Sequence, residues 1–102
     1  MDLALQALAE PRRREILAVI GEGELSAGEI ASRFAVTRPA ISQHLAVLRA
    51  AGLVVERRDG TRRLYRSRPE GAGEVREWLE TFWRGALGRL KDEAEREARR
   101  QR

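Results

Sequence analysis

The segment from Thr37 to Leu48 carries side chains that suit the recognition of nucleic acid bases. Arg38, Ser42 and Gln43 are spaced so that a helix would present them on its exposed side. In the major groove of DNA, glutamine pairs well with adenine and arginine with guanine, and serine can bond to either base edge. The pattern therefore predicts a helix that reads DNA.

The same segment predicts how that helix is held. Ile41, Leu45 and Leu48 recur at spacings of four and three, which is typical of a helix with one face in a core. Thr37 fits the N-cap position, and its hydroxyl or amide can also contact a phosphate. Pro39 is tolerated in the first turn, where amides have no acceptor within the helix. His44, the only histidine, lies between the two faces, where we expect packing or a phosphate contact.

A basic β-hairpin is predicted directly after this helix, over about residues 53–67. Two runs of strand composition, 53–57 and 62–66, flank an Asp-Gly turn signal at 59–60. Alternate residues of a strand point to opposite faces, so only some of the hairpin arginines can meet one ligand. The candidates in the wing are Arg57, Arg58, Arg62 and Arg63. The DNA contacts expected among them are Arg58, Arg62 and Arg63, of which Arg58 and Arg62 lie nearest the tip.

The charge of the chain is concentrated in this part. Residues 37–68 contain eight arginines against Glu56 and Asp59, a balance of +6. The other 70 residues carry 12 basic and 14 acidic groups, a balance of −2, which gives the net +4 of the chain. A basic excess confined to one third of the sequence favours a polyanionic partner, with a solvated charged surface as the alternative.

The length of 102 residues fits a single domain, residues 1–102, that is mainly α-helical with a small β-hairpin. Asp2 is expected to cap the first helix, and Ser26 with Glu29 forms a capping box before the third. The third helix and the base-reading helix, about 37–51, make a helix-turn-helix, and the hairpin adds a wing. The other helices are predicted at 3–9, 11–20, 26–35 and about 74–100.

An apolar stripe runs along the last predicted helix. A single small domain cannot easily cover a stripe of this width, so we expect a homodimer that uses this helix and the first one. A hydrophobic ligand pocket walled by the two tryptophans is the alternative. The expected interface residues are Leu3, Leu5, Leu8, Val75, Trp78, Leu79, Phe82, Trp83 and Leu87.

Four segments together resemble the ArsR-type family of winged helix-turn-helix repressors. They are residues 7–17, 25–31 and 41–54, and Arg58-Asp59-Gly60 with Leu64-Tyr65. The resemblance covers residues 3 to about 67. It implies a homodimeric bacterial or archaeal repressor that binds a palindromic operator in double-stranded DNA and leaves it when an effector binds.

The sequence departs from the metal-sensing branch of that family. The chain has no cysteine, and the last predicted helix has no histidine. Carboxylates alone are poor ligands for zinc, copper or nickel, so we expect no metal site and no cofactor. Arg12, Arg13 and Arg14 stand at a predicted helix N-terminus, where cations are unfavourable, and so point to a nearby anion or carboxylate.

Composition and motifs argue against other classes of protein. No apolar run is long enough to span a membrane, and no signal peptide or cysteine is present, so we expect a cytoplasmic, nucleoid-associated protein. No paired carboxylates, activated nucleophile or phosphate-binding glycine loop indicate an enzyme. A winged-helix module that binds proteins instead of DNA is the alternative function. The basic balance of residues 37–68 argues against it.

Overall fold

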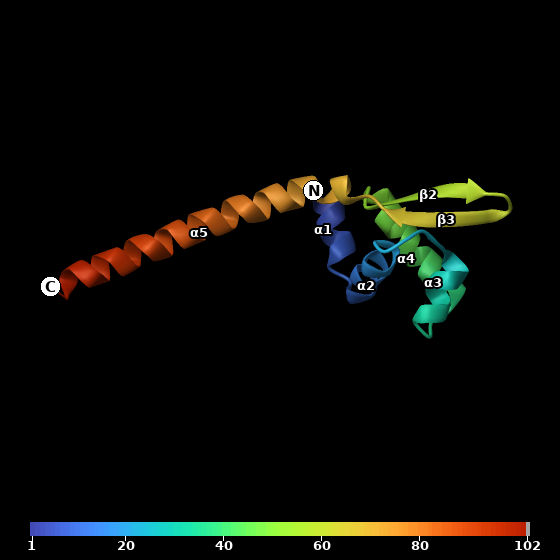
Figure 1. Ribbon diagram of the computed structural model, residues 1–102, viewed down its shortest axis with the longest axis horizontal. Helices are drawn as coiled ribbons and strands as arrows, with labels where there is room; N and C mark the ends of the chain where they lie inside the picture. Colours follow the sequence, from blue (N-terminus) through green and yellow to red (C-terminus); the bar gives the residue numbers. More distant parts are fainter. Residues whose placement is uncertain (102) are drawn as a thin grey trace.

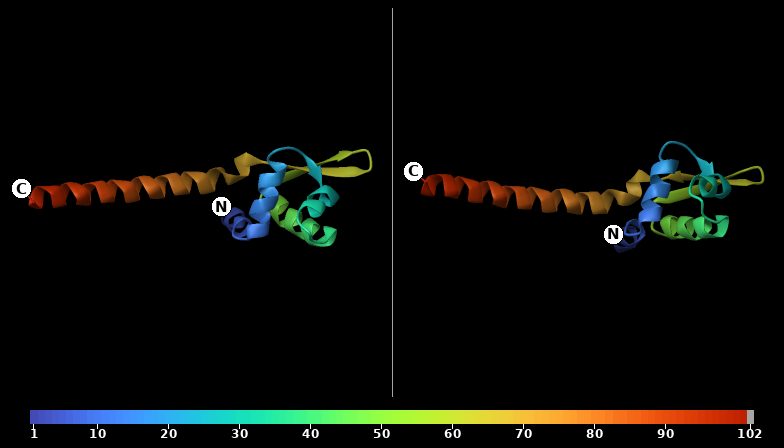
Figure 2. Two further views of the ribbon diagram at one scale, coloured as in Figure 1. Left: turned by 60° about the horizontal axis from the view of Figure 1, so that its bottom comes forward. Right: turned by 90° about the horizontal axis from the view of Figure 1, so that it is seen from below.

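The computed structural model describes residues 1–101 and has the shape of a small domain with a long arm (Figure 1). Its principal extents are 72 × 25 × 22 Å. The domain holds four helices and a three-stranded sheet, and the arm is the C-terminal helix (Figure 2). The predicted class, mainly α with a β-hairpin wing in a winged helix-turn-helix, is confirmed.

Helices precede and follow the hairpin along the chain. The helical elements are α1 (Asp2–Leu8), α2 (Pro11–Ile20), α3 (Ala27–Arg33), α4 (Arg38–Ala50), the short 3-10 helix η1 (Pro69–Ala72) and α5 (Gly73–Arg100). The strands are β1 (Leu25–Ser26), β2 (Val54–Asp59) and β3 (Arg62–Ser67). The helix predicted over 26–35 is shorter than expected because Ala35 has a φ of 38°, outside the helical region.

The sheet has the order β1-β3-β2, and all its pairs are antiparallel. Gly60 takes a φ of 65° in the turn between β2 and β3, a conformation that glycine adopts without strain. The strand β1 has only two residues, Leu25 and Ser26, which pair with Tyr65 and Leu64. The sequence analysis did not predict β1, because two residues show no alternation and Ser26 also caps α3.

The core joins α1, α2, α3, α4, the base of the wing and the first turn of α5. Ile41, Leu45 and Leu48 of α4 are 0–1% exposed, as their spacing predicted. Ile16 and Ile30 face them from α2 and α3 and are fully buried. Burial of each such side chain stabilises the fold by about 1.5–3 kcal/mol, so α4 is held firmly along its whole inner face.

The caps of the helix-turn-helix agree with the sequence patterns. The Ser26 hydroxyl accepts a hydrogen bond from the Glu29 amide at 3.2 Å, and the Ser26 amide donates to the Glu29 carboxylate at 3.1 Å. The Thr37 hydroxyl accepts from the Ala40 amide at 3.3 Å. The cap predicted for α1 was wrong: Met1 is the N-cap, and Asp2 is the first helical residue. There its charge still suits the positive end of the helix dipole.

Three successive arginines at the start of α2 hold the preceding helix. Arg13 donates to the Ala7 carbonyl at 2.7 Å, and Arg14 donates to the Leu8 carbonyl at 2.6 Å. These carbonyls belong to the last turn of α1, where no amide of the helix donates a hydrogen bond to them. Arg12 forms an ion pair with Glu15 and lies 5.0 Å from the centre of the Phe34 ring. The three arginines therefore have their partners inside the protomer. Most of these partners are carbonyl oxygens, whereas the sequence predicted an anion or a carboxylate.

The helix α5 leaves the domain after its first turn (Figure 2). At 28 residues it is about 42 Å long. Val75 is 6% exposed and belongs to the core of the protomer, because α5 still lies against the domain at that point. Val75 was predicted to lie in the dimer interface, but within one protomer it is already covered. Leu8 is half-buried against the same core.

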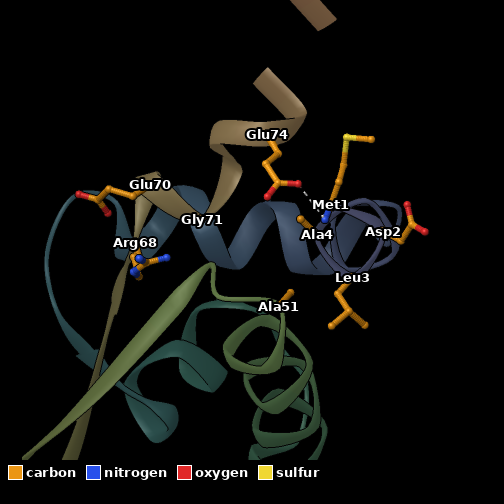
Figure 3. Close-up of a pocket in the computed structure, with 9 residues that line it drawn as sticks. All are labelled: Met1, Asp2, Leu3, Ala4, Ala51, Arg68, Glu70, Gly71 and Glu74. Carbon is orange, nitrogen blue, oxygen red and sulfur yellow. Dashed lines mark ion pairs between the residues drawn. The ribbon is translucent and has the colours of Figure 1, made fainter. Parts of the chain in front are cut away.

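The junction between the domain and the arm is tight. A Cβ atom at Gly71 would lie 2.0 Å from the Gly52 carbonyl oxygen, so only glycine fits there. Arg68 donates to the same oxygen at 3.2 Å. The Met1 amino group forms an ion pair with Glu74 at 3.3 Å, across an open groove of about 590 Å³ (Figure 3). The end of α4 is thus fixed against the base of α5.

Candidate DNA-binding interface

The helix α4 presents the predicted base-contacting residues to solvent. Arg38, Ser42 and Gln43 are all exposed, whereas Ile41, Leu45 and Leu48 of the same helix are buried. His44 is half-buried at the edge between the two faces, as its position in the sequence indicated. The rigid inner face and the Thr37 cap fix the direction in which the three exposed side chains project.

The wing divides its arginines between two faces. Arg58 pairs with Arg63 across the hairpin and Glu56 pairs with Tyr65, so these side chains share one face. Glu56 reaches Arg49 of α4 at 2.5 Å, which identifies that face as the one turned toward α4. The five arginines of the hairpin therefore cannot act as one uniform patch.

The other face of the wing is turned toward carboxylates. Arg57 pairs with Leu64 in the register, and Arg62 pairs with Asp59. Arg57 forms an ion pair with Glu24, with Nε to oxygen distances of 2.8 and 3.1 Å. Arg62 forms an ion pair with Glu29 at the start of α3.

These contacts shift the titration of both carboxylates. The hydrogen bond from Arg57 holds the pKa of Glu24 below its ordinary value. The pKa of Glu29 is lowered by hydrogen bonds from the backbone and hydroxyl of Ser26, with a further contribution from Arg62. Both groups are therefore charged at neutral pH. They partly neutralise the side of the wing that they face.

Three arginines near α4 and the wing tip have no carboxylate partner among residues 1–101: Arg38, Arg58 and Arg63. A groove of about 470 Å³ lies between the start of α4, the start of α3 and the wing. Arg38, Ser42, Arg62 and Arg63 line this groove. The arrangement places unpaired positive charge beside the exposed face of α4, as a phosphate-contacting surface requires.

A polar cluster holds the wing against α4. Glu56 forms an ion pair with Arg49 and lies beside Tyr65. Burial, reinforced by the Glu56 charge, raises the pKa of the Tyr65 phenol. Arg63 and Ser42 lie at the edge of the same cluster. The spacing between α4 and the wing is therefore set within one protomer.

Glu24 and Glu29 were not predicted as parts of this surface. Both precede the basic segment, and Glu29 was recognised only as a helix cap. The alternation of side chains along each strand does indicate that Arg57 and Arg62 lie on the face opposite Arg58 and Arg63. The identity of the partners required the fold, since 33 residues separate each pair.

The terminal helices carry a large exposed apolar surface. Trp78 and Trp83 are 53% and 57% exposed, so within one protomer they do not wall a pocket. Trp78 stacks on Phe82 with ring centroids 5.5 Å apart, and Phe82 meets Trp83 edge to face. The other exposed apolar residues of these helices are Leu3, Leu5, Leu79, Leu87 and Leu90.

Other kinds of site find no support among the described residues. In residues 1–101, no three histidine, cysteine, aspartate or glutamate side chains are grouped so as to hold a metal ion. No helix described by the structure is long and apolar enough to cross a membrane.

Fold and surface together define a winged helix-turn-helix regulator, with α4 as the recognition helix and the β2–β3 hairpin as the wing. Residues 8–57 match a family model described as a helix-turn-helix domain. The HTH-type transcriptional regulator Rv2034 of Mycobacterium tuberculosis is 48% identical over 86 residues, which cover 84% of this chain and 80% of that protein. The chain belongs to the ArsR family of transcriptional regulators.

Two further proteins show the range of this similarity. The transcriptional repressor SdpR of Bacillus subtilis is 37% identical over 60 residues, 59% of this chain and 67% of that protein. The solution structure of Mb0332 from Mycobacterium bovis, described as a homodimeric winged helix-turn-helix DNA-binding domain, superposes with a TM-score of 0.66. It is 31% identical, and the match covers 79% of this chain and 75% of that one. Members of this family are regulators, not enzymes.

Proposed function

We propose that the chain is a homodimeric, sequence-specific DNA-binding repressor that blocks a promoter by occupying it. The observation that carries this proposal is that three arginines with no carboxylate partner among residues 1–101 lie beside the exposed face of α4. A repressor needs only to bind in the right place, and no catalytic group is required. The similarity to SdpR, a named repressor, supports this direction of regulation.

Base reading falls to Gln43, Ser42 and Arg38 in the major groove. Thr37 and His44, at the start and edge of α4, supply or support phosphate contacts. Arg58 and Arg63 of the wing contact phosphates beside the groove, since they share the face turned toward α4. Arg62 lies on the other face of the wing but lines the same groove as Arg63, and it starts from an ion pair with Glu29.

The dimer forms through the exposed apolar residues of α1 and α5. Six large apolar side chains on α5 are 43–61% exposed in the protomer, which is unfavourable for a helix in water. A two-fold axis at this arm would relate two recognition helices, and a palindromic operator has the same symmetry. The homodimeric state of Mb0332 supports this assignment.

Release from DNA uses a trigger other than a thiol-bound metal, because the chain contains no cysteine. As a DNA-bound regulator, the protein acts in the cytoplasm at the nucleoid.

Titration with duplex DNA at several salt concentrations tests the proposal. We expect binding at low salt that weakens steeply as salt rises, with a slope of about −0.9 for each phosphate contacted. Replacement of Arg63 by alanine should flatten the slope by about 0.9 per protomer. Absence of binding at low salt would contradict the repressor and favour a protein-binding module.

A further inference from the structure

We propose that Glu29 is a carboxylate built into the DNA interface that competes with DNA phosphate for Arg62. In this role Glu29 lowers the affinity of the protein for DNA of any sequence. The inference rests on the proposed function, because it requires that the wing meets DNA.

The position of Arg62 gives the first argument. Arg62 lines the groove between α3, α4 and the wing together with Arg38 and Arg63, neither of which has a carboxylate partner in residues 1–101. A phosphate held by those two arginines would lie within reach of Arg62. The Arg62 guanidinium, however, already contacts the Glu29 carboxylate.

The second argument is that Glu29 is fixed while Arg62 is long and adaptable. The Ser26 amide donates to the Glu29 carboxylate at 3.1 Å, and the Glu29 amide donates to the Ser26 hydroxyl at 3.2 Å. This capping box orders the carboxylate before any arginine approaches. The same hydrogen bonds lower the pKa of Glu29, so it stays charged at neutral pH.

The ion pair of Arg62 and Glu29 can exchange partners. The two side chains are 55% and 46% exposed, and ion pairs this accessible to water are weak. A phosphate can therefore displace Glu29 from Arg62. The displaced carboxylate remains beside the phosphate and repels it, so the competition weakens binding without preventing it.

The neighbouring pair offers a contrast. Arg57 and Glu24 form an equivalent ion pair, but Arg57, unlike Arg62, does not line the groove with Arg38 and Ser42. Its main effect is to hold the wing against β1. Competition for a phosphate is therefore specific to Glu29.

The variant Glu29→Gln tests the proposal, since glutamine can also serve in a capping box. With a random-sequence duplex, we expect it to bind roughly fivefold more tightly than wild type at 0.1 M salt. The salt slope should steepen by about 0.9 per protomer. Glu22→Gln is the matched control, because Glu22 is exposed and forms no ion pair in the described residues. Glu22→Gln makes the same change of charge, and it should alter the affinity and the salt slope less than Glu29→Gln does.

Repeating Glu29→Gln in an Arg62→Ala background separates competition from simple repulsion. The gain should largely disappear there, because the arginine that Glu29 occupies is absent. An equal gain in both backgrounds, or no gain in either, would overturn the proposal.

Two arginine variants test the proposal without relying on correct folding of Glu29→Gln. Arg62→Ala should weaken random-DNA binding less than Arg63→Ala does, because Arg62 must first leave Glu29. A larger loss for Arg62→Ala would overturn the proposal. Wild-type protein that fails to bind DNA would contradict the proposed function instead, so the two failures are distinguishable.

Discussion

The two ends of this molecule differ in how complete they are within one protomer. At the winged end, α4 has a buried inner face, a capped start and a wing held by ion pairs to Glu24, Glu29 and Arg49. At the other end, α5 extends into solvent with two tryptophans and a phenylalanine about half exposed. The winged end can therefore present its contacts alone, whereas the apolar surface of the arm stays uncovered in one protomer.

This difference indicates that the two ends contribute separately to DNA binding. Affinity for a single DNA half-site should depend on α4 and the wing, and affinity for a full operator should depend on the arm as well. Variants at the two ends should accordingly separate in their effects, and the junction at Gly71 should affect both.

The largest effect should come from charging the arm. In Trp83→Glu, a carboxylate replaces an exposed aromatic ring in the apolar surface of α5, and burying it against a second chain is unfavourable. We expect monomers on a sizing column and a loss of operator affinity of about 100-fold or more, since paired binding is lost.

Arg84→Glu is the control for that variant, because it changes the charge of the same helix at a residue outside the apolar stripe. It should leave the dimer intact. A dimer that persists in Trp83→Glu would place the interface elsewhere and remove the distinction between the two ends.

The next effect should come from the base-reading face. Gln43→Ala removes an exposed amide from α4 without touching the core. We expect a loss of about 1–3 kcal/mol on the operator and little change on random DNA, measured by competition binding. Equal losses on both would show that Gln43 contacts the backbone and does not read bases.

The junction should show a comparable effect on folding. In Gly71→Ala, the new methyl group would lie 2.0 Å from the Gly52 carbonyl oxygen, so the backbone must shift. We expect a loss of stability of about 1–3 kcal/mol by denaturant unfolding. Gly73→Ala is the control, since nothing lies within 4 Å of a Cβ there. Similar stability for the two variants would contradict a tight junction.

The smallest effect should be the pH dependence of the wing. The pKa values of Glu24 and Glu29 are lowered from 4.5, so their contribution to stability is present above that value and is lost as pH falls through the shifted pKa. The protection of the β3 amides, measured as their hydrogen exchange relative to unstructured peptide at the same pH, should therefore decrease in acid below about pH 4.5. In Glu24→Gln this decrease should be smaller, and an unchanged profile would contradict the role of the ion pairs in holding the wing.

The sequence predicted the features that depend on local patterns. Helical periodicity and capping residues placed α4 within a residue of each end, and the Asp-Gly signal placed the wing turn. The exposed stripe of α5 was also predicted, except for Val75. Val75 continues the spacing of the stripe, but it is buried because α5 leaves the domain only after its first turn.

The features that the sequence did not predict depend on long-range contacts. The partners of Arg57 and Arg62 are 33 residues away, and β1 exists only because β3 lies beside it. Arg13 and Arg14 were an anomaly in the sequence, since cations are unfavourable at a helix N-terminus. Their partners are the end carbonyls of α1, which local patterns do not reveal.

The most direct test of the central claim is a selection of bound fragments from the genome of the source organism, followed by footprinting and measurement of the mass of the complex. We expect an inverted repeat whose half-site centres are about 10 base pairs apart, protected by two chains. Fragments with no common sequence, or a single site protected by one chain, would contradict the account of a base-reading winged end joined through the α5 arm.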